Sequence, residues 1–177
     1  MCRALALVAF GLAVPALLSS QDSVRSTFSL AAGVNGVGFP ADPAFGVVAQ
    51  AGYLWQYDRL AVRLGADYFK ANREFSGGES LRPRAVGATL EISYDVLTSR
   101  FRPYVIGGWG LYRLTDTRVD ALGTHAVDDL SASMVGGLGF RYRVGSRYLF
   151  TEARLHGFTG GGHWGSHFMP ITAGMRF

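Results

Sequence analysis

After about the first twenty residues, apolar positions alternate with small or polar positions along most of the chain. Eight stretches show this period of two, at 24–34, 47–55, 60–68, 86–94, 103–114, 130–142, 149–155 and 171–177. Because successive side chains of a β-strand point to opposite faces, the pattern predicts eight strands, each with one apolar face. In 103–114, which is rich in glycine, the pattern does not show which residues form that face.

The connections between these stretches alternate in length. Short turns with the sequences "QYDR", "LTSR" and "GSR" follow the second, fourth and sixth stretches. Longer, polar and glycine-rich segments follow the others: "NGVGFPADPAFG", "NREFSGGES", "TDTRVDALGTHAVDD" and "TGGGHWGSH". This alternation predicts an up-and-down antiparallel sheet with short turns at one end and long loops at the other. Pro83 and Pro103 are expected at the first positions of their strands, where a missing N–H is tolerated.

The first residues have the pattern of a secretory leader. Arg3 precedes an apolar run over 4–18, and 19–21 form a small polar boundary. Such a segment is typical of a signal peptide and too short for a spanning helix. We therefore expect a leader at 1–21 and one barrel domain at 22–177, with a retained signal anchor as the alternative. Cys2, the only cysteine, lies in the leader, so no disulfide is expected within the chain.

Charged residues are few, and many of them alternate with the apolar face. Charged residues make up 17% of the chain, against roughly 25% in typical soluble domains, and the only lysine is Lys70. Six charges, three of each sign, fall on the face opposite the apolar one: Arg63, Asp67, Glu91, Arg141, Glu152 and Arg154. Charges buried inside a narrow eight-stranded barrel must be paired. The pattern therefore predicts a lumen plugged by ion pairs, with a narrow ion path as the alternative.

Aromatic residues gather near the short turns, as expected for one interfacial belt of a membrane barrel. The predicted belt contains Tyr53, Trp55, Tyr94, Tyr104, Tyr142 and Tyr148, with Tyr57, Phe101 and Phe177 beside them. The apolar face then meets lipid. The predicted fold class is all-β, an eight-stranded antiparallel up-and-down transmembrane β-barrel. A soluble secreted barrel with its apolar face inside is the alternative, and the shortage of lysine argues against it.

Two segments carry a family resemblance, "RPYVIGGWGLY" and the terminal "PITAGMRF". With the leader and the eight strands, they resemble the small OmpA/OmpX-type outer-membrane proteins, grouped as the outer-membrane β-barrel or porin-like family. The resemblance implies a bacterial outer-membrane protein in contact with lipid and lipopolysaccharide. It also implies that the last strand is a signal for the barrel-assembly machinery, carried by Phe177 and more weakly by Met175 and Ile171.

The same resemblance implies a protein that works through its external loops. Many members of the family have no catalytic activity and stabilise the envelope, adhere or bind partners. We expect such a structural, adhesive or ligand-interaction role, in a monomer with no cofactor and no nucleic-acid partner. The formal net charge of +4 is too small and too scattered to indicate a nucleic-acid-binding surface.

Histidines near the last loop raise an enzyme alternative. The segment "HGFTGGGHWGSH" resembles the place where lipid A deacylases of barrel fold carry a His-x-Ser-Asn motif, but no serine follows His156 at that spacing. Ser166 would have to act as nucleophile, with His156, His163 or His167 as base and Glu152 as orienting residue. On one strand Glu152 and His156 would lie ~13 Å apart, too far for a direct hydrogen bond.

The loops hold weaker candidates for binding. His163 and His167 have the ligand type of a metal site but no third ligand in sequence. An acidic loop could hold Ca²⁺, although its spacing matches no known calcium loop and a solvated loop is the simpler interpretation; its residues are Asp116, Asp120, Asp128 and Asp129. Loop aromatics could form an adhesive rim or pack on one another; they are Phe39, Phe45, Phe75 and Trp164.

Overall fold

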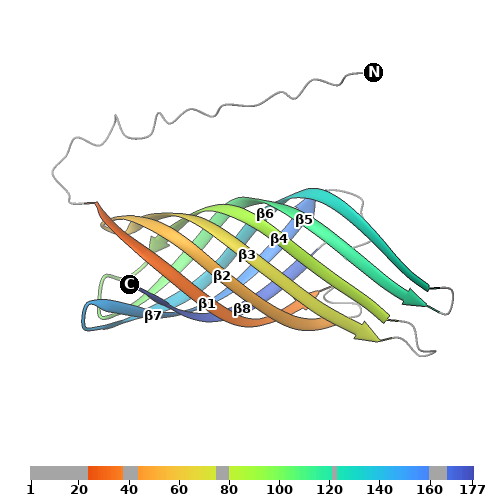
Figure 1. The fold of residues 1–177 in the computed structure, drawn as a ribbon. Helices are drawn as coiled ribbons and strands as arrows, with labels where there is room; N and C mark the ends of the chain where they lie inside the picture. The colour runs from red at the N-terminus through yellow and green to blue at the C-terminus, as the bar shows by residue number, and fades with distance from the viewer. Residues whose placement is uncertain (1–23, 38–43, 75–79, 121–122, 160–166) are drawn as a thin grey trace, which may run out of the picture.

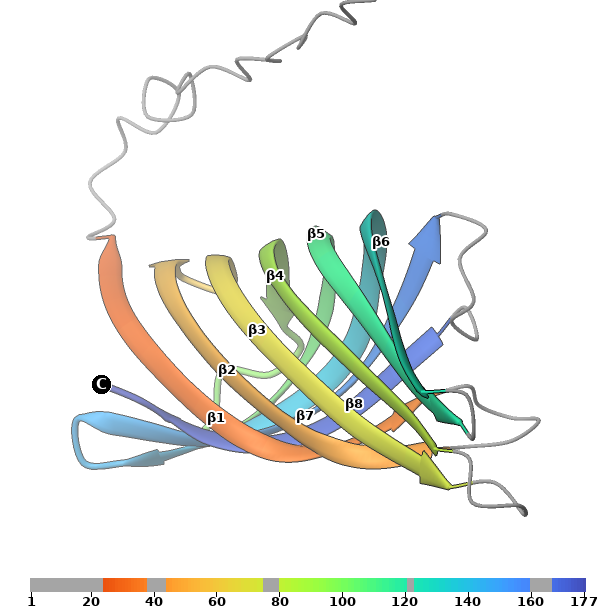
Figure 2. The ribbon, with the colours of Figure 1, turned by 45° about the vertical axis from the view of Figure 1, so that its right-hand side comes forward.

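The computed structural model shows a closed barrel of eight antiparallel strands (Figures 1 and 2). It describes residues 24–37, 44–74, 80–120, 123–159 and 167–177. Each strand pairs with its neighbours in sequence, and β8 pairs with β1, which confirms the predicted fold class and strand count. The strands are β1 (Arg25–Val37), β2 (Ala44–Tyr57), β3 (Leu60–Glu74), β4 (Ser80–Asp95), β5 (Phe101–Asp120), β6 (Gly123–Val144), β7 (Arg147–Thr159) and β8 (His167–Arg176).

The predicted leader, 1–21, lies outside the described residues. Within the described segments, no helix has the length and apolar character needed to cross a membrane.

Tight turns join the strands at one end of the barrel. β2 and β3 are joined by the two residues 58–59, and β6 and β7 by 145–146. The first residue of each turn has a left-handed backbone, with φ of 47° at Asp58 and 62° at Gly145. Aspartate and glycine accept this conformation readily, which allows a two-residue hairpin. The C-terminus lies at this same end, on the left of Figure 1.

At the opposite end, β5 and β6 are longer than the alternation predicts. Their ladder continues to the pair Asp120↔Gly123, so most of "TDTRVDALGTHAVDD" is strand and the prediction of a long loop there is wrong. Both faces of this part of the hairpin are polar, so no apolar alternation marks it as strand. The expected positions of the prolines are also wrong, because β4 begins at Ser80 before Pro83 and β5 at Phe101 before Pro103.

The seam between β1 and β8 closes the barrel. Their ladder runs from Ser29↔Arg176 to Val37↔Phe168. The Phe177 N–H extends it by donating to the Phe28 carbonyl at 2.8 Å. The Phe177 ring faces outward with 49% of its surface exposed, and the Arg147 guanidinium lies 5.4 Å from the ring centroid. The last residue is therefore held by a backbone hydrogen bond and a cation–π contact.

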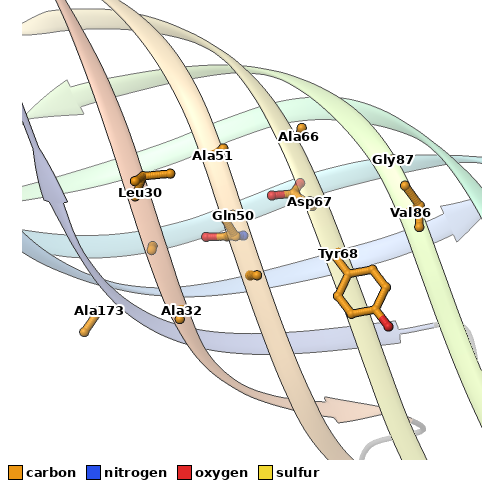
Figure 3. A pocket seen from close by; sticks show the side chains of 12 residues that line it. Leu30, Ala32, Gln50, Ala51, Ala66, Asp67, Tyr68, Val86, Gly87 and Ala173 are labelled. Carbon is orange, nitrogen blue, oxygen red and sulfur yellow. The ribbon is translucent and has the colours of Figure 1, made fainter.

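The outer surface is apolar around the middle of the barrel. Its exposed side chains include Leu30, Val34, Val47, Leu64, Leu90, Trp109, Leu138 and Ile171. Small residues line a shallow depression in this wall, across β8, β1, β2, β3 and β4, among them Ala32, Ala51 and Ala66 (Figure 3). Behind it, Gln50 and Asp67 are buried and point into the lumen. The apolar face thus lies outside and the polar face inside.

The structure shows which side chains of β5 point into the lumen. Tyr104 and Tyr112 are inside, 1% and 0% exposed, while Trp109 is outside. Each tyrosine ring lies against a glycine of another strand. A Cβ on Gly139 would lie 2.5 Å from Tyr104 Cζ, and a Cβ on Gly87 would lie 2.3 Å from Tyr112 Cδ1. The lumen accepts two large rings because the facing positions carry no side chain.

We expect Gly139→Ala to lower the free energy of unfolding by about 1–3 kcal/mol, because the added methyl group would overlap the Tyr104 ring. Gly136→Ala is the matched control, since it lies on the same strand and a Cβ there has nothing within 4 Å. Urea unfolding in detergent, followed by tryptophan fluorescence, measures both. Equal stability of the two variants would contradict the packing assigned to Tyr104.

Candidate functional site: the polar lumen

Four charged side chains form a network in the middle of the lumen. Arg63 on β3 contacts Glu91 on β4 and lies 3.3 Å from Glu152 Oε2 on β7. Arg154 contacts the same two carboxylates, with Nη1 3.2 Å from Glu91 Oε1. Each of the four is at least 93% buried. Because every cation faces both anions, the buried charges are neutralised as a group, which buried ions require.

All six charges that the sequence assigns to the lumen lie there, but they do not form one cluster. Asp67 lies toward the loop end, where it accepts a hydrogen bond of 2.7 Å from the Tyr112 hydroxyl. Arg141 lies at the short-turn end and forms an ion pair with Asp95, a partner that the sequence analysis did not identify. Asp95 lies four residues after Glu91 on β4 and therefore on the same inner face. The alternation in the sequence could have predicted this inward position.

Two members of the predicted aromatic belt are in the lumen, so their assignment to the belt is wrong. Tyr104 donates a hydrogen bond of 2.6 Å to Glu152 Oε1 and belongs to the central network. Tyr148 is half-buried at the short-turn mouth, with its ring 5.7 Å from the Arg102 guanidinium carbon. It lies four residues before Glu152 on β7 and therefore shares its inner face. The other four predicted members face outward: Tyr53, Trp55, Tyr94 and Tyr142.

Aromatic rings close the lumen toward the loop end. Phe69 stacks on Phe168 with ring centroids 5.3 Å apart, and Phe158 meets Phe168 edge-to-face at 5.2 Å. Below them lies His156, 0% exposed, with its Nδ1 3.2 Å from the Tyr112 hydroxyl. The sequence analysis missed this cluster, although each residue lies at an inward position of its strand.

Of the residues of the enzyme alternative that the structure describes, His156 and Glu152 are not brought together. His156 contacts Tyr112 and Phe69, whereas Glu152 is bound by Tyr104, Arg63 and Arg154. Ser166 and His163 lie outside the described residues. His167, at the start of β8, is exposed.

The metal candidates find little support in the described segments. No group of three or more His, Cys, Asp or Glu side chains in them is placed to hold a metal ion. Asp128 instead pairs with Arg113 at 2.7 Å and accepts a hydrogen bond of 2.6 Å from Thr115. Of the loop aromatics, Phe45 is the second residue of β2 and 71% exposed. Phe39, Phe75 and Trp164 lie outside the described residues.

The centre of the lumen leaves little free space. A cavity of about 10 Å³ lies between Arg63, Glu91, Glu152 and Arg176. That volume corresponds to about one water molecule. This cavity beside the central network is therefore too small for a hydrated ion.

Comparison with solved structures identifies the fold. No protein-family model matches the chain, and no curated protein matches its sequence. Neisserial surface protein A (NspA) superposes with a TM-score of 0.59 at 18% identity, over 87% of this chain and 97% of that one. This chain has the fold of the eight-stranded outer-membrane β-barrels.

Two further structures share this barrel. Ail, the attachment invasion locus protein of Yersinia pestis, solved with the heparin analogue sucrose octasulfate, has a TM-score of 0.53 at 13% identity, over 88% and 99% of the two chains. The outer membrane enzyme PagL has a TM-score of 0.51 at 14% identity, over 86% and 99%. At such identities the comparison establishes the fold and not the activity, because one fold carries different functions.

We expect Glu91→Gln to lower the free energy of unfolding by about 3–5 kcal/mol, because Arg63 and Arg154 would share one buried carboxylate fewer. Arg113→Gln is the control, since it breaks an ion pair exposed to solvent and should change stability little. Urea titration of the two variants in detergent provides the comparison. If Glu91→Gln unfolds at the same urea concentration as the parent, the central network does not stabilise the barrel.

Proposed function

We propose that the protein is an integral barrel of the bacterial outer membrane with a structural, adhesive or ligand-binding role, exercised through the end that carries the long connections. The observation that supports this most strongly is the distribution of side chains in the closed barrel. The outer face is apolar and the lumen holds paired charges, the opposite of a soluble barrel. Such a wall is stable in lipid, because closure leaves no unpaired backbone edge.

Residues at the two ends of the apolar wall support this membrane position. Outward aromatic rings lie near the short turns, where Tyr53 meets Trp55 edge-to-face at 5.0 Å and Phe101 stacks on Phe140 at 5.3 Å. Exposed basic residues lie toward the other end: Lys70, Arg84 and Arg113. An aromatic belt on one side matches an interfacial position. The cations on the other side suit the phosphates of lipopolysaccharide, which we propose as the contacting lipid.

The β5–β6 hairpin is the proposed working surface. Residues 123–130 of β6 are all exposed, and they extend past Thr159, where β7 ends. The Thr115 hydroxyl and the Arg113 guanidinium lower the pKa of the Asp128 carboxyl, so this ion pair persists to a more acidic pH than that of an ordinary aspartate. Ail, with the same fold, was solved in complex with a heparin analogue, which supports a ligand-binding role for a barrel of this kind.

A folded barrel in the membrane fraction is the first expected result. The protein should resist carbonate extraction, and its unboiled sample should migrate differently from its boiled sample on a gel. In planar bilayers it should show no discrete conductance steps, because the centre of the lumen holds space for about one water. Release by carbonate would contradict the membrane assignment. Conductance steps that change in Glu152→Gln would favour the narrow pore instead.

We further propose that the barrel-assembly machinery recognises the last strand, through Phe177 and more weakly Met175 and Ile171, and that the product is a monomer. Phe177→Ala should reduce insertion in cells several-fold and leave refolding into detergent micelles unchanged. Phe101→Ala, which removes another outward aromatic ring, is the control and should insert normally. Equal loss of refolding and insertion in Phe177→Ala would show that the ring acts by packing alone.

A further inference from the structure

An arginine-rich cavity lies inside the barrel mouth at the short-turn end. Its volume is about 540 Å³. Five arginines from four strands line it, together with the Tyr148 ring: Arg25 on β1, Arg102 on β5, Arg141 and Arg143 on β6, and Arg176 on β8. Among the described residues that line it, Asp58 is the only carboxylate. We refer to this cavity as the arginine vestibule.

The charges of the vestibule are not balanced. Asp95, buried beneath it, pairs with both Arg141 and Arg102, with 3.5 Å to the Arg102 Nη1. Counting Asp58 and Asp95 against the five arginines leaves an excess of three positive charges. Glu152 adds little, because it lies 3.8 Å from Arg176 and is already bound by other arginines of the central network.

Two of the arginines also have unused hydrogen-bond donors. Arg141 and Arg176 are 3% and 4% exposed, yet the Nε of each meets no acceptor among the described residues. A buried donor destabilises a fold when no acceptor forms a hydrogen bond with it. The two side chains are held in place by aromatic rings: Arg141 lies 5.3 Å and Arg176 5.4 Å from the centroid of Tyr104. The donors are therefore fixed in position.

The vestibule is closed at its inner end. Arg176 lines both the vestibule and the cavity of about 10 Å³ beyond it, where Arg63 and Glu152 lie. A molecule that enters from the short-turn side meets the central network and stops there. The vestibule therefore has the form of a binding pocket and not of the mouth of a channel.

We propose that the arginine vestibule binds a small, multiply charged phosphate-bearing anion. Guanidinium groups suit this chemistry, because their planar fork donates two parallel hydrogen bonds to a phosphate. The volume of the vestibule falls within the range of small-molecule sites. Two sources share the chemistry, a soluble phosphate ester and a phospholipid headgroup. The inference that the ligand arrives from the periplasm rests on the proposed function, whereas the inference that the vestibule binds an anion does not.

The test is calorimetric titration of the detergent-solubilised, refolded protein with inorganic pyrophosphate. We expect saturable binding that weakens as salt is raised. Arg102→Gln and Arg143→Gln should each weaken it about tenfold, the loss expected for one charge-assisted hydrogen bond. Arg82→Gln is the matched control, because Arg82 is exposed near the opposite end of β4 and its removal should change affinity less than about twofold. The gel shift of unboiled samples establishes that each variant is folded.

Repeating the titration in lipid nanodiscs distinguishes the two ligand sources, a soluble phosphate ester and a phospholipid headgroup. If the site takes soluble phosphates, pyrophosphate affinity at fixed salt is the same in discs containing phosphatidylglycerol and in discs with an equal charge of a carboxylate lipid, because both repel the anion equally. If the site takes a headgroup, phosphatidylglycerol competes and the apparent affinity is lower in those discs. Absence of saturable binding by the parent protein overturns the proposal, and so does equal weakening by Arg82→Gln and Arg143→Gln. Arg25→Gln, at the edge of the barrel, provides a further variant if the others fail to fold.

Discussion

The interior of an eight-stranded barrel is so narrow that each polar side chain in it must find its partner among the others. The ring of Arg63, Glu91, Arg154 and Glu152 meets this requirement across three strands, β3, β4 and β7. It also fixes how the strands pair. A slip of one residue would move these charges to the apolar outer wall and bring apolar side chains inside. The network thus specifies the register as well as filling the lumen.

The same requirement divides the lumen into three parts. The centre is neutral and full, and Tyr104 and Tyr112 enter the lumen where Gly139 and Gly87 leave space. The loop half is closed by stacked aromatic rings, and the short-turn mouth is open and rich in arginine. Because the centre leaves no passage, the proposed functions are located at the ends of the barrel. The barrel wall holds those ends on opposite sides of its apolar outer band.

Alternation in the sequence predicts the strand number and the inward position of the six charges, because both follow from the period of two. It does not predict the position of Tyr104, because β5 is rich in glycine and neither of its faces is clearly apolar. The Tyr104–Glu152 contact joins residues 48 positions apart, and it depends on how the strands tilt around the barrel. The extension of the β5–β6 hairpin is not predicted for another reason. A strand exposed to water on both faces does not need alternating apolar and polar residues.

The side-chain charges in the lumen must sum to about zero only where water is excluded. At the mouths a charge keeps part of its hydration, so an excess of one sign can remain there without unfolding the barrel. The five arginines of the vestibule follow this rule, since the exposed Arg25 and Arg143 lie at its rim and the buried Arg141 pairs with Asp95. Arg176 lies deepest and shares Glu152 with the central network. Positive charge therefore increases from the centre to the short-turn mouth, and an anion entering there would meet the guanidinium groups that line the vestibule.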